Sequence, residues 1–334
     1  MEDVAREAGV SRALVSLVMR DSPQVSDKRR AAVLKAAEKL AYRPNILARN
    51  LASQRTRTLG VLVNDLHNPF FSEVLDGIEE EAEGGGLQVL ILNGGRDPGR
   101  ERRAIESFLQ LRVEGLVLIG SRLDDAALIE AHSQAPTVVV ASGRTHAAVD
   151  TITTHEARGA ALAVDHLVSL GHRSIVHLDG AQNISATPRR DGYVAAMRSH
   201  GLEPRVALAG DTDGDAHAAI DEAMAASDPP SAIFAFNDLV AAGALDHLDD
   251  LQLRVPDDIS VVGYDNTFIA GLHHLALTTI NQPRVRMGRL AVSTLMERLN
   301  GGRGAQVQVE LDPELVVRGS TSAPSFPTQS ESTS

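Results

Sequence analysis

The sequence contains no cysteine, which excludes a disulfide framework, a thiolate metal site and a cysteine nucleophile. It also contains no apolar run near the roughly 18–20 residues that span a bilayer. The first 25 residues lack the apolar block and small-residue cleavage site of a signal peptide. These absences predict a soluble cytoplasmic protein with no membrane partner.

Sequence signatures of catalysis are missing as well. No P-loop, no GxSxG elbow and no GxGxxG at a strand–helix junction occurs in the chain. The twelve histidines are scattered, and His273 and His274 lack partners at metal-ligand spacing. We therefore expect no enzymatic activity, no cofactor and no metal site.

Charge is distributed unevenly along the chain. Residues 1–57 contain twelve Lys and Arg against six Asp and Glu, whereas the remaining residues contain 20 basic and 38 acidic side chains. A small basic head on a large acidic body predicts a polyanionic partner that binds at one end only. A solvated basic arm without a partner is the alternative that charge alone leaves open.

The N-terminal head has the pattern of short helices. Helices are predicted over residues 2–8 and 11–20, with Ser11 as the N-cap of the second. A longer helix is predicted over residues 27–42, ended by Pro44. The predicted fold of this part is all-α, of the helix-turn-helix type.

From Leu59 onward the pattern changes to alternating strands and helices. Buried-strand runs such as 59–63, 87–92 and 115–120 alternate with amphipathic helical stretches such as 70–83. This alternation predicts an α/β body with parallel sheets and crossover helices. More than ten such units are too many for one compact sheet, so we expect two doubly wound lobes. A ligand would bind between them, at the carboxyl ends of the strands.

The second predicted helix has two different sides. At 100° per residue, the outward side is formed by Arg12, Ala13, Ser16, Leu17 and Arg20. This division suits a recognition helix in a DNA major groove. A three-helix module that binds another protein would be similarly amphipathic, but the basic outward side and its basic neighbours favour DNA.

Six segments carry a family resemblance. In chain order they are DVAREAGVSRALVSLVMR, VSDKRRAAVLKAAEKLAYRPNILARNLAS, NPFF, FAFNDLVAAG, VPDDISVVGYDN and LTTINQP. Together they resemble the lactose/galactose-repressor (LacI/GalR) family of bacterial transcription regulators over roughly residues 1–320. The resemblance implies a homodimeric repressor, bound to double-stranded operator DNA on the nucleoid. It also implies control by a small-molecule effector, a sugar, bound between two lobes of periplasmic-binding-protein type.

The resemblance also implies the domain organisation. The expected parts are a helix-turn-helix domain (1–44), a hinge (45–57), an effector-binding and dimerisation domain (58–320) and a disordered tail (321–334). Within 58–320, lobe 1 takes about 58–156 and 284–312, and lobe 2 takes about 157–282 and 313–320. The lobes would rotate about three crossovers, near residues 156, 282 and 313.

In the head, the resemblance places Arg12, Ala13 and Leu17 at base-reading positions, and Ser11 and Ser16 near phosphates. A leucine cannot hydrogen-bond a guanine but can contact a thymine methyl group. We therefore expect Leu17 to face an A·T pair or a weakly discriminated position, and Arg12 to be the main guanine reader.

Two further positions of the head depart from the family pattern. Leu14 stands where threonine is usual, and Ala41 replaces a common helix-ending glycine. Because alanine is disfavoured in the backbone conformation that glycine adopts there, Ala41 is expected to introduce strain.

The hinge segment, residues 45–54, is too short to form a stable isolated helix, which needs about 12–15 residues. In the resembled family it folds in the minor groove, where Leu51 would wedge between base pairs. Asn45 would cap this helix, Ala48 would lie on the groove floor and Arg49 would neutralise a phosphate. A passive linker helix, with Leu51 packed on its own body, is the alternative.

Polar and aromatic side chains at the predicted cleft suit a polyhydroxylated ligand. Asp265 and Asn237 follow buried strands, Arg189 begins a helix, and Phe70 and Phe71 follow the first body strand. The resemblance places all five at effector-contact positions. As alternatives, Asp265 could cap a helix and one phenylalanine could belong to the core. A cytoplasmic sugar-binding protein without a DNA role remains the second functional hypothesis.

Overall fold

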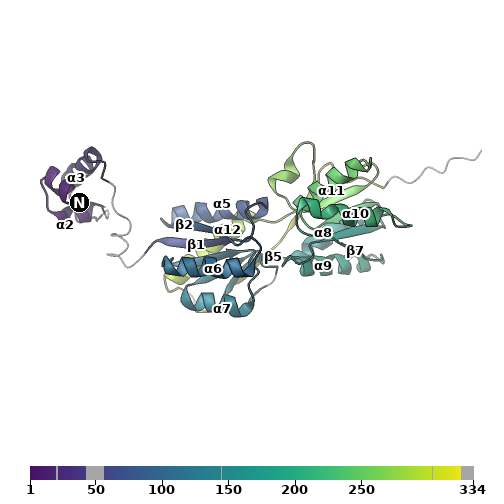
Figure 1. Ribbon diagram of the computed structural model, residues 1–334, viewed down its shortest axis with the longest axis horizontal. Helices are drawn as coiled ribbons and strands as arrows, with labels where there is room; N and C mark the ends of the chain where they lie inside the picture. Colours follow the sequence, from purple (N-terminus) through teal and green to yellow (C-terminus); the bar gives the residue numbers. More distant parts are fainter. Residues whose placement is uncertain (20–21, 43–55, 144, 303, 325–334) are drawn as a thin grey trace, which may run out of the picture. The chain divides into compact units, whose positions relative to one another are not determined.

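The computed structural model describes residues 1–19, 22–42, 56–143, 145–302 and 304–324, which fall into two compact units, Met1–Arg57 and Thr58–Ser334 (Figure 1). Most of the predicted hinge lies outside the described residues, as does Arg20. The hinge positions concerned are Asn45, Ala48, Arg49 and Leu51.

The first unit contains three helices, α1 (Glu2–Glu7), α2 (Arg12–Met19) and α3 (Asp27–Lys39). Its core consists mainly of valines and alanines from all three helices. Ser11 caps α2 as predicted, because its Oγ accepts a hydrogen bond from the Leu14 amide at 3.2 Å. The third helix ends earlier than predicted. It stops at Lys39, well before Pro44, because Ala41 has a φ of +47°, the strained conformation expected at a glycine position.

The second unit contains two six-stranded sheets, one in each lobe. The lobe 1 sheet has the strand order β11-β5-β4-β3-β1-β2 and is parallel throughout. Its strands are β1 (Thr58–Val63), β2 (Gln88–Asn93), β3 (Gly115–Ile119), β4 (Thr137–Val140), β5 (Asp150–Thr154) and β11 (Gln308–Leu311). The first and third strands are buried along almost their whole length, as the continuous apolar runs predict.

The lobe 2 sheet has the order β12-β10-β9-β8-β6-β7. Its strands are β6 (Ile175–Asp179), β7 (Arg205–Leu208), β8 (Ala232–Ala235), β9 (Ser260–Asp265), β10 (Thr278–Asn281) and β12 (Glu314–Val316). One strand departs from the predicted parallel arrangement, since β12 pairs antiparallel with β10. A short edge strand that returns directly from the other lobe needs no crossover helix, so it can pair in this direction.

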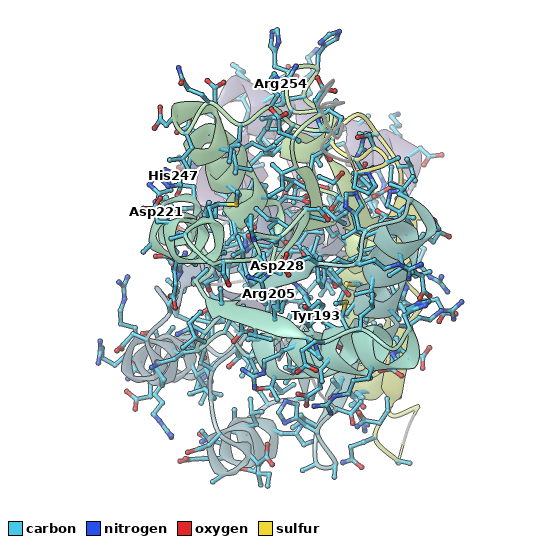
Figure 2. The ribbon with its side chains drawn as sticks, turned by 90° about the vertical axis from the view of Figure 1, so that its right-hand side faces the viewer. Tyr193, Arg205, Asp221, Asp228, His247 and Arg254 are labelled. Carbon is cyan, nitrogen blue, oxygen red and sulfur yellow. The ribbon has the colours of Figure 1, made fainter. Side chains whose placement is uncertain are left out.

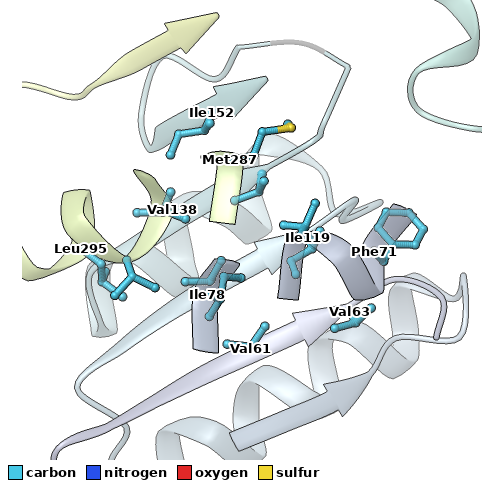
Figure 3. Close-up of a cluster of buried hydrophobic side chains, with 14 of the residues drawn as sticks. Val61, Val63, Phe71, Ile78, Ile119, Val138, Ile152, Met287 and Leu295 are labelled. Carbon is cyan, nitrogen blue, oxygen red and sulfur yellow. The ribbon is translucent and has the colours of Figure 1, made fainter. Parts of the chain in front are cut away.

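Helices cover both faces of each sheet, which makes each lobe doubly wound. In lobe 1, α5 and α12 lie on one side of the sheet and α6 and α7 on the other (Figure 1). These helices are α5 (Pro69–Gly84), α6 (Pro98–Gln110), α7 (Asp125–Gln134) and α12 (Arg284–Leu299). Figure 3 shows how Ile78 of α5 and Leu295 of α12 pack with Val61 and Val138 of the strands.

Lobe 2 has the same plan. Its helices are α8 (Glu156–Ser169), α9 (Ala186–Ser199), α10 (His217–Met224) and α11 (Asp238–Asp250), with the short 3₁₀ helices η1 (Asp213–Ala216) and η2 (Phe268–Gly271). Asp221 of α10 and His247 of α11 lie side by side (Figure 2), with 2.8 Å between Oδ1 and Nε2. Along the described parts of the chain, no three acidic or histidine side chains are grouped so as to hold a metal ion.

Helices α5 and α12 approach so closely that their backbones touch. A Cβ atom on Gly77 would lie 2.1 Å from the carbonyl oxygen of Val285, and one on Gly288 would lie 2.1 Å from that of Val74. The two glycines therefore allow a contact that any side chain would prevent.

The chain crosses between the lobes three times, at residue 155, at residues 282–283 and at residues 312–313. After the last strand, Thr321 and Ser322 contact lobe 2. The distance from Thr321 Oγ1 to His166 Nε2 is 3.0 Å, and that from the Ser322 carbonyl oxygen to His172 Nε2 is 2.9 Å. The prediction of a disordered tail from residue 321 was therefore wrong for residues 321–324. Among the described residues, no helix is long and apolar enough to cross a membrane.

Candidate effector pocket and DNA-reading head

A pocket lies where the loops at the carboxyl ends of the strands from both lobes meet. Its walls lie close together and leave about 30 Å³ for the centre of a water-sized molecule, within a wider hollow of about 410 Å³ that includes open solvent. The structure brings all five predicted effector residues into its wall, namely Phe70, Phe71, Arg189, Asn237 and Asp265. These residues come from both lobes, so the pocket exists only while the lobes face each other.

Arg189, in the first turn of α9, is fixed on every side. Its Nε and Nη2 donate to Oε2 of Glu156 at 3.0 and 2.7 Å, and its Nη1 donates to the carbonyl oxygen of Phe236. The guanidinium carbon lies 3.5 Å from the centre of the Tyr264 ring. Burial alone would lower the pKa of Arg189, but the surrounding acidic groups, with Glu156 first among them, together raise that pKa. Arg189 is therefore a rigid cation that is already neutralised within the pocket wall.

Asp265 ends strand β9 in an unusual conformation. Its φ is +107°, a value that costs about 1–3 kcal/mol for residues other than glycine and is typical of functional sites. Its Oδ1 accepts a hydrogen bond from Nε2 of Gln282 at 2.7 Å, and its carbonyl oxygen accepts one from Arg284. Burial raises the pKa of Asp265 to about 8, against the opposing effect of Arg189. The raised pKa favours the protonated, neutral form of this carboxyl group, which can donate a hydrogen bond.

Asn237 joins the pocket to helix α11. Its Oδ1 caps the helix by accepting from the Val240 amide at 2.8 Å, and its Nδ2 donates to the carbonyl oxygen of Asp211 at 3.1 Å. The next residue, Asp238, lies behind the pocket wall and accepts from the Thr279 hydroxyl at 2.6 Å. Burial raises the pKa of Asp238 to about 6. Asn237 is thus held by its own hydrogen bonds and shapes the pocket.

Phe70 and Phe71 are positioned by the start of α5. Asn68 caps this helix by accepting from the Phe70 amide at 2.9 Å, and the two rings pack edge to face with centroids 5.3 Å apart. Both rings line the pocket and also belong to the lobe 1 core. Both phenylalanines therefore belong to the core as well as to the pocket wall, and their contact with an effector stays a prediction.

Several pocket residues were not predicted from the sequence. Asn64 follows β1, is 3% exposed, and its Oδ1 has no hydrogen-bond partner among the described residues. Because it stands directly after a buried strand, the rule that identified Asp265 could also have identified it. The other unpredicted polar residues in the wall are Asn68, Glu156, Asn183, Ser185 and Gln282.

In the head, the structure separates the predicted DNA-facing residues into two groups. Ser11, Arg12 and Ala13 are exposed, whereas Ser16 and Leu17 are half-buried. Leu17 packs against the head core, so its predicted outward position was only partly right. A long side chain on a helix leans back over the preceding turn, which brings this leucine against the core. Arg12 pairs with Glu2 at 3.4 Å, an exposed contact of little strength.

A basic helix-turn-helix head joined to a two-lobed, pocketed body defines a ligand-responsive transcription regulator. The profile described as "Bacterial regulatory proteins, lacI family" matches residues 1–45, and that of a "Periplasmic binding protein-like domain" matches residues 164–321. The chain belongs to the LacI family of bacterial regulatory proteins, and it is a regulator and not an enzyme.

Similar proteins span nearly its whole length. The HTH-type transcriptional repressor PurR of Vibrio vulnificus is 36% identical over 95% of this chain and 97% of its own, and PurR of Photobacterium profundum is 34% identical over 96% and 98%. Among solved structures, the lac repressor dimer bound to operator and the anti-inducer ONPF has a TM-score of 0.86 at 29% identity, over 96% of this chain and 98% of that chain. The transcriptional regulator CelR in complex with cellobiose has a TM-score of 0.72 at 29% identity over the same shares.

Proposed function

We propose that this protein is a repressor that binds a pseudo-palindromic operator as a homodimer and responds to a neutral sugar bound between its lobes. The operator complex would place it on the nucleoid, in the cytoplasm. The lac repressor dimer bound to operator and the CelR–cellobiose complex support both halves of the proposal. A sugar-binding protein without a DNA role would not need a basic head with an exposed Arg12.

The preference for a neutral effector rests on the charges in the pocket wall. Arg189 is paired with Glu156, and burial raises the pKa of Asp265, which favours the neutral form of its carboxyl group. The wall therefore offers no uncompensated cation to an anionic ligand. It offers amide and carboxyl groups, among them the unpaired Oδ1 of Asn64, together with aromatic rings for the apolar face of a sugar.

In the head, we propose that Arg12 reads a guanine, that Ala13 and Leu17 contact base edges, and that Ser11 and Ser16 contact phosphates. Arg20 would add a further contact from the same side of the helix. The exposed positions of Ser11, Arg12 and Ala13 support this assignment.

For the hinge, we propose that Leu51 is the wedge that bends the operator, with Asn45, Ala48 and Arg49 supporting it in the groove. Inserting an apolar side chain between base pairs costs free energy because it unstacks them. The bent duplex then contacts more of the protein surface, which offsets that cost. We expect Leu51→Ala to bind operator more weakly and bend it less. Equal binding and bending would favour the passive linker helix instead.

The effector class can be tested by thermal unfolding of the full chain with cellobiose, ribose, a sugar phosphate and free nucleobases. A ligand at about 100 times its Kd stabilises the folded state by about 2.7 kcal/mol, so a neutral sugar that binds raises Tm. A rise in Tm with only the sugar phosphate or the nucleobases would contradict the neutral-sugar class. Repeating the series with operator DNA gives the sign of the coupling between the two ligands.

A further inference from the structure

A group of charged side chains joins the two lobes beside the effector pocket. Arg96, in the loop between β2 and α6 of lobe 1, donates from Nε and Nη2 to Oδ2 of Asp65 at 3.1 and 2.6 Å. Its Nη1 donates across to Oδ1 of Asp211 in lobe 2 at 2.9 Å. A second lobe 1 cation, Arg122, lies 3.6 Å from Oδ2 of the same carboxylate. Asp211 thus receives two cations from the opposite lobe.

On the lobe 2 side, Asp211 is bonded to two amides of the pocket wall. Its Oδ2 accepts from Nδ2 of Asn183 at 2.8 Å, and its carbonyl oxygen accepts from Nδ2 of Asn237 at 3.1 Å. The loop itself is held in place, because the Asp211 amide donates to Oδ2 of Asp215 at 3.2 Å. Any displacement of Asp211 would therefore move two pocket residues.

On the lobe 1 side, Arg96 is equally close to the pocket. Its amide donates to the carbonyl oxygen of Asn64 at 3.0 Å, and Asn64 lines the pocket with an unpaired Oδ1. The residue has a φ of +58°, an uncommon conformation for arginine, in a turn whose Gly95 amide donates to Asn93. Each partner of the ion pair is therefore one hydrogen bond away from a pocket wall residue.

The carboxylates of this group are largely buried, while the arginine is partly open to solvent. The side chains of Asp65 and Asp211 are 8% and 15% exposed, and that of Arg96 is 30% exposed. A pair in this position is weakened by salt but stronger than one fully in water.

We propose that the Arg96–Asp211 ion pair is a clasp, a contact that holds the two lobes in the closed arrangement. Through it, the positions of the pocket amides and the closure of the lobes depend on each other. Closing the clasp places Asn64 from one lobe opposite Asn183 and Asn237 from the other. Opening it separates these groups, so effector binding and closure favour each other. Arg96 and Asp211 act as positioning residues in this arrangement. The inference concerns regulation of the effector site and rests on the proposed function.

The absence of cysteine makes the clasp directly testable. Ser107→Cys near the end of α6 and Ser199→Cys at the end of α9 put one exposed thiol on each lobe for a pair of dyes. Energy transfer is then measured in full-length protein without effector, with one labelled protomer per dimer. Arg96→Gln and Asp211→Asn should each raise the ratio of open to closed molecules by at least about fivefold, the effect of a modest ion pair.

Three comparisons separate a clasp from a local structural effect. The double variant should open no further than Asp211→Asn, which already removes the contacts of both Arg96 and Arg122, and Arg96→Lys, which keeps the charge, should recover part of the closed population. Salt at about 1 M, where the Debye length is about 3 Å, should open the unsubstituted protein but barely affect the variants. Arg289→Gln, which removes an exposed arginine paired with Glu80 within lobe 1, should change nothing.

Transfer efficiencies that are unchanged in both single variants, or that shift additively in the double variant, would overturn the clasp. Because this measurement uses no effector, such a result would leave the proposed sugar response standing. Failure of every sugar to raise Tm would conversely leave the clasp intact.

Discussion

At the scale of single residues, Asp265 stands out because its surroundings act on the pKa of its carboxyl group in opposite directions. It is buried, it has a positive φ, and it lies near both a buried arginine and a second carboxyl group, Asp238. Asparagine tolerates positive φ better than most residues and keeps an oxygen that Gln282 can bond. Asp265→Asn therefore removes the titratable group and leaves the geometry close to that of the original.

We predict that Asp265 makes a contribution to stability that is lost as pH rises from about 4 to about 8, while the buried His177, whose pKa burial lowers to about 3, gives an opposite dependence below about pH 6.5. A carboxyl group with a pKa raised from 3.8 to about 8 binds its proton more tightly in the folded state, so folding is favoured at low pH and loses this contribution as pH rises. Asp265→Asn should remove this contribution, so its stability should fall less than that of the unsubstituted protein as pH rises, most clearly above about pH 6.5, where the buried histidines are neutral in both states. Thermal unfolding at several pH values measures this, with the exposed Asp250→Asn as control. An equal dependence in the Asp265 variant would contradict the assignment.

Leu17 carries a prediction about sequence preference. Because it is half-buried against the head core, it offers DNA only part of an apolar side chain. Leu17→Arg should add a guanine preference at one operator position and lower the stability of the head. Selection of operators from random DNA measures the preference, with Leu34→Arg on the exposed side of α3 as control. Identical preferences at every position would contradict a base-reading role for this residue.

At the scale of elements, the contact between α5 and α12 depends on two glycines. We predict that Gly77→Ala or Gly288→Ala destabilises lobe 1 by at least about 2 kcal/mol, because the added methyl group would overlap backbone that cannot move aside. Gly84→Ala in the same helix has open space around its Cβ and should be neutral or stabilising. Denaturant unfolding of the three variants checks the difference. Equal stability of Gly77→Ala and Gly84→Ala would show that the helices can separate at little cost.

The sequence predicted the elements better than it predicted their contacts. Strand–helix alternation was enough to predict two doubly wound lobes, and the rule that ligands bind at strand ends identified Asp265 and Asn237. The direction of β12 was not predictable, since a three-residue edge strand has almost no pattern of its own. Nor were the glycine contacts of α5 and α12, because they depend on how two helices meet.

The unpredicted pocket residues also show that contacts between distant parts of the chain cannot be predicted from the sequence. Glu156 is an ordinary first-turn acidic residue in the sequence, and only the fold pairs it with Arg189. Asn183 and Ser185 lie in a loop with no periodic signal. Their roles depend on residues that are distant in the chain, which a single sequence does not reveal.

For the whole molecule, the separation of charge predicts how salt affects DNA binding. The basic head should give a linear fall of log affinity with log salt, each neutralised phosphate adding about −0.9 to the slope. Arg49→Gln should make the slope of the proposed homodimer shallower by about 1.8, because each of its two protomers is expected to lose one neutralised phosphate. Arg254→Gln on the acidic body should not alter the slope. Fluorescence anisotropy on an operator duplex measures both variants, and a slope that Arg49→Gln leaves unchanged would show that this arginine neutralises no phosphate.

The three crossovers between the lobes also have a consequence for synthesis. The head helices are complete at Lys39, whereas the lobe 1 sheet needs β11 and the lobe 2 sheet needs β12, both close to the carboxyl terminus. On the ribosome, where domains generally fold in order of emergence, neither lobe can finish its sheet until the other is almost fully made. A chain released before residue 308 would carry a finished head on two unfinished lobes, and its one complete part would be the part that binds no effector.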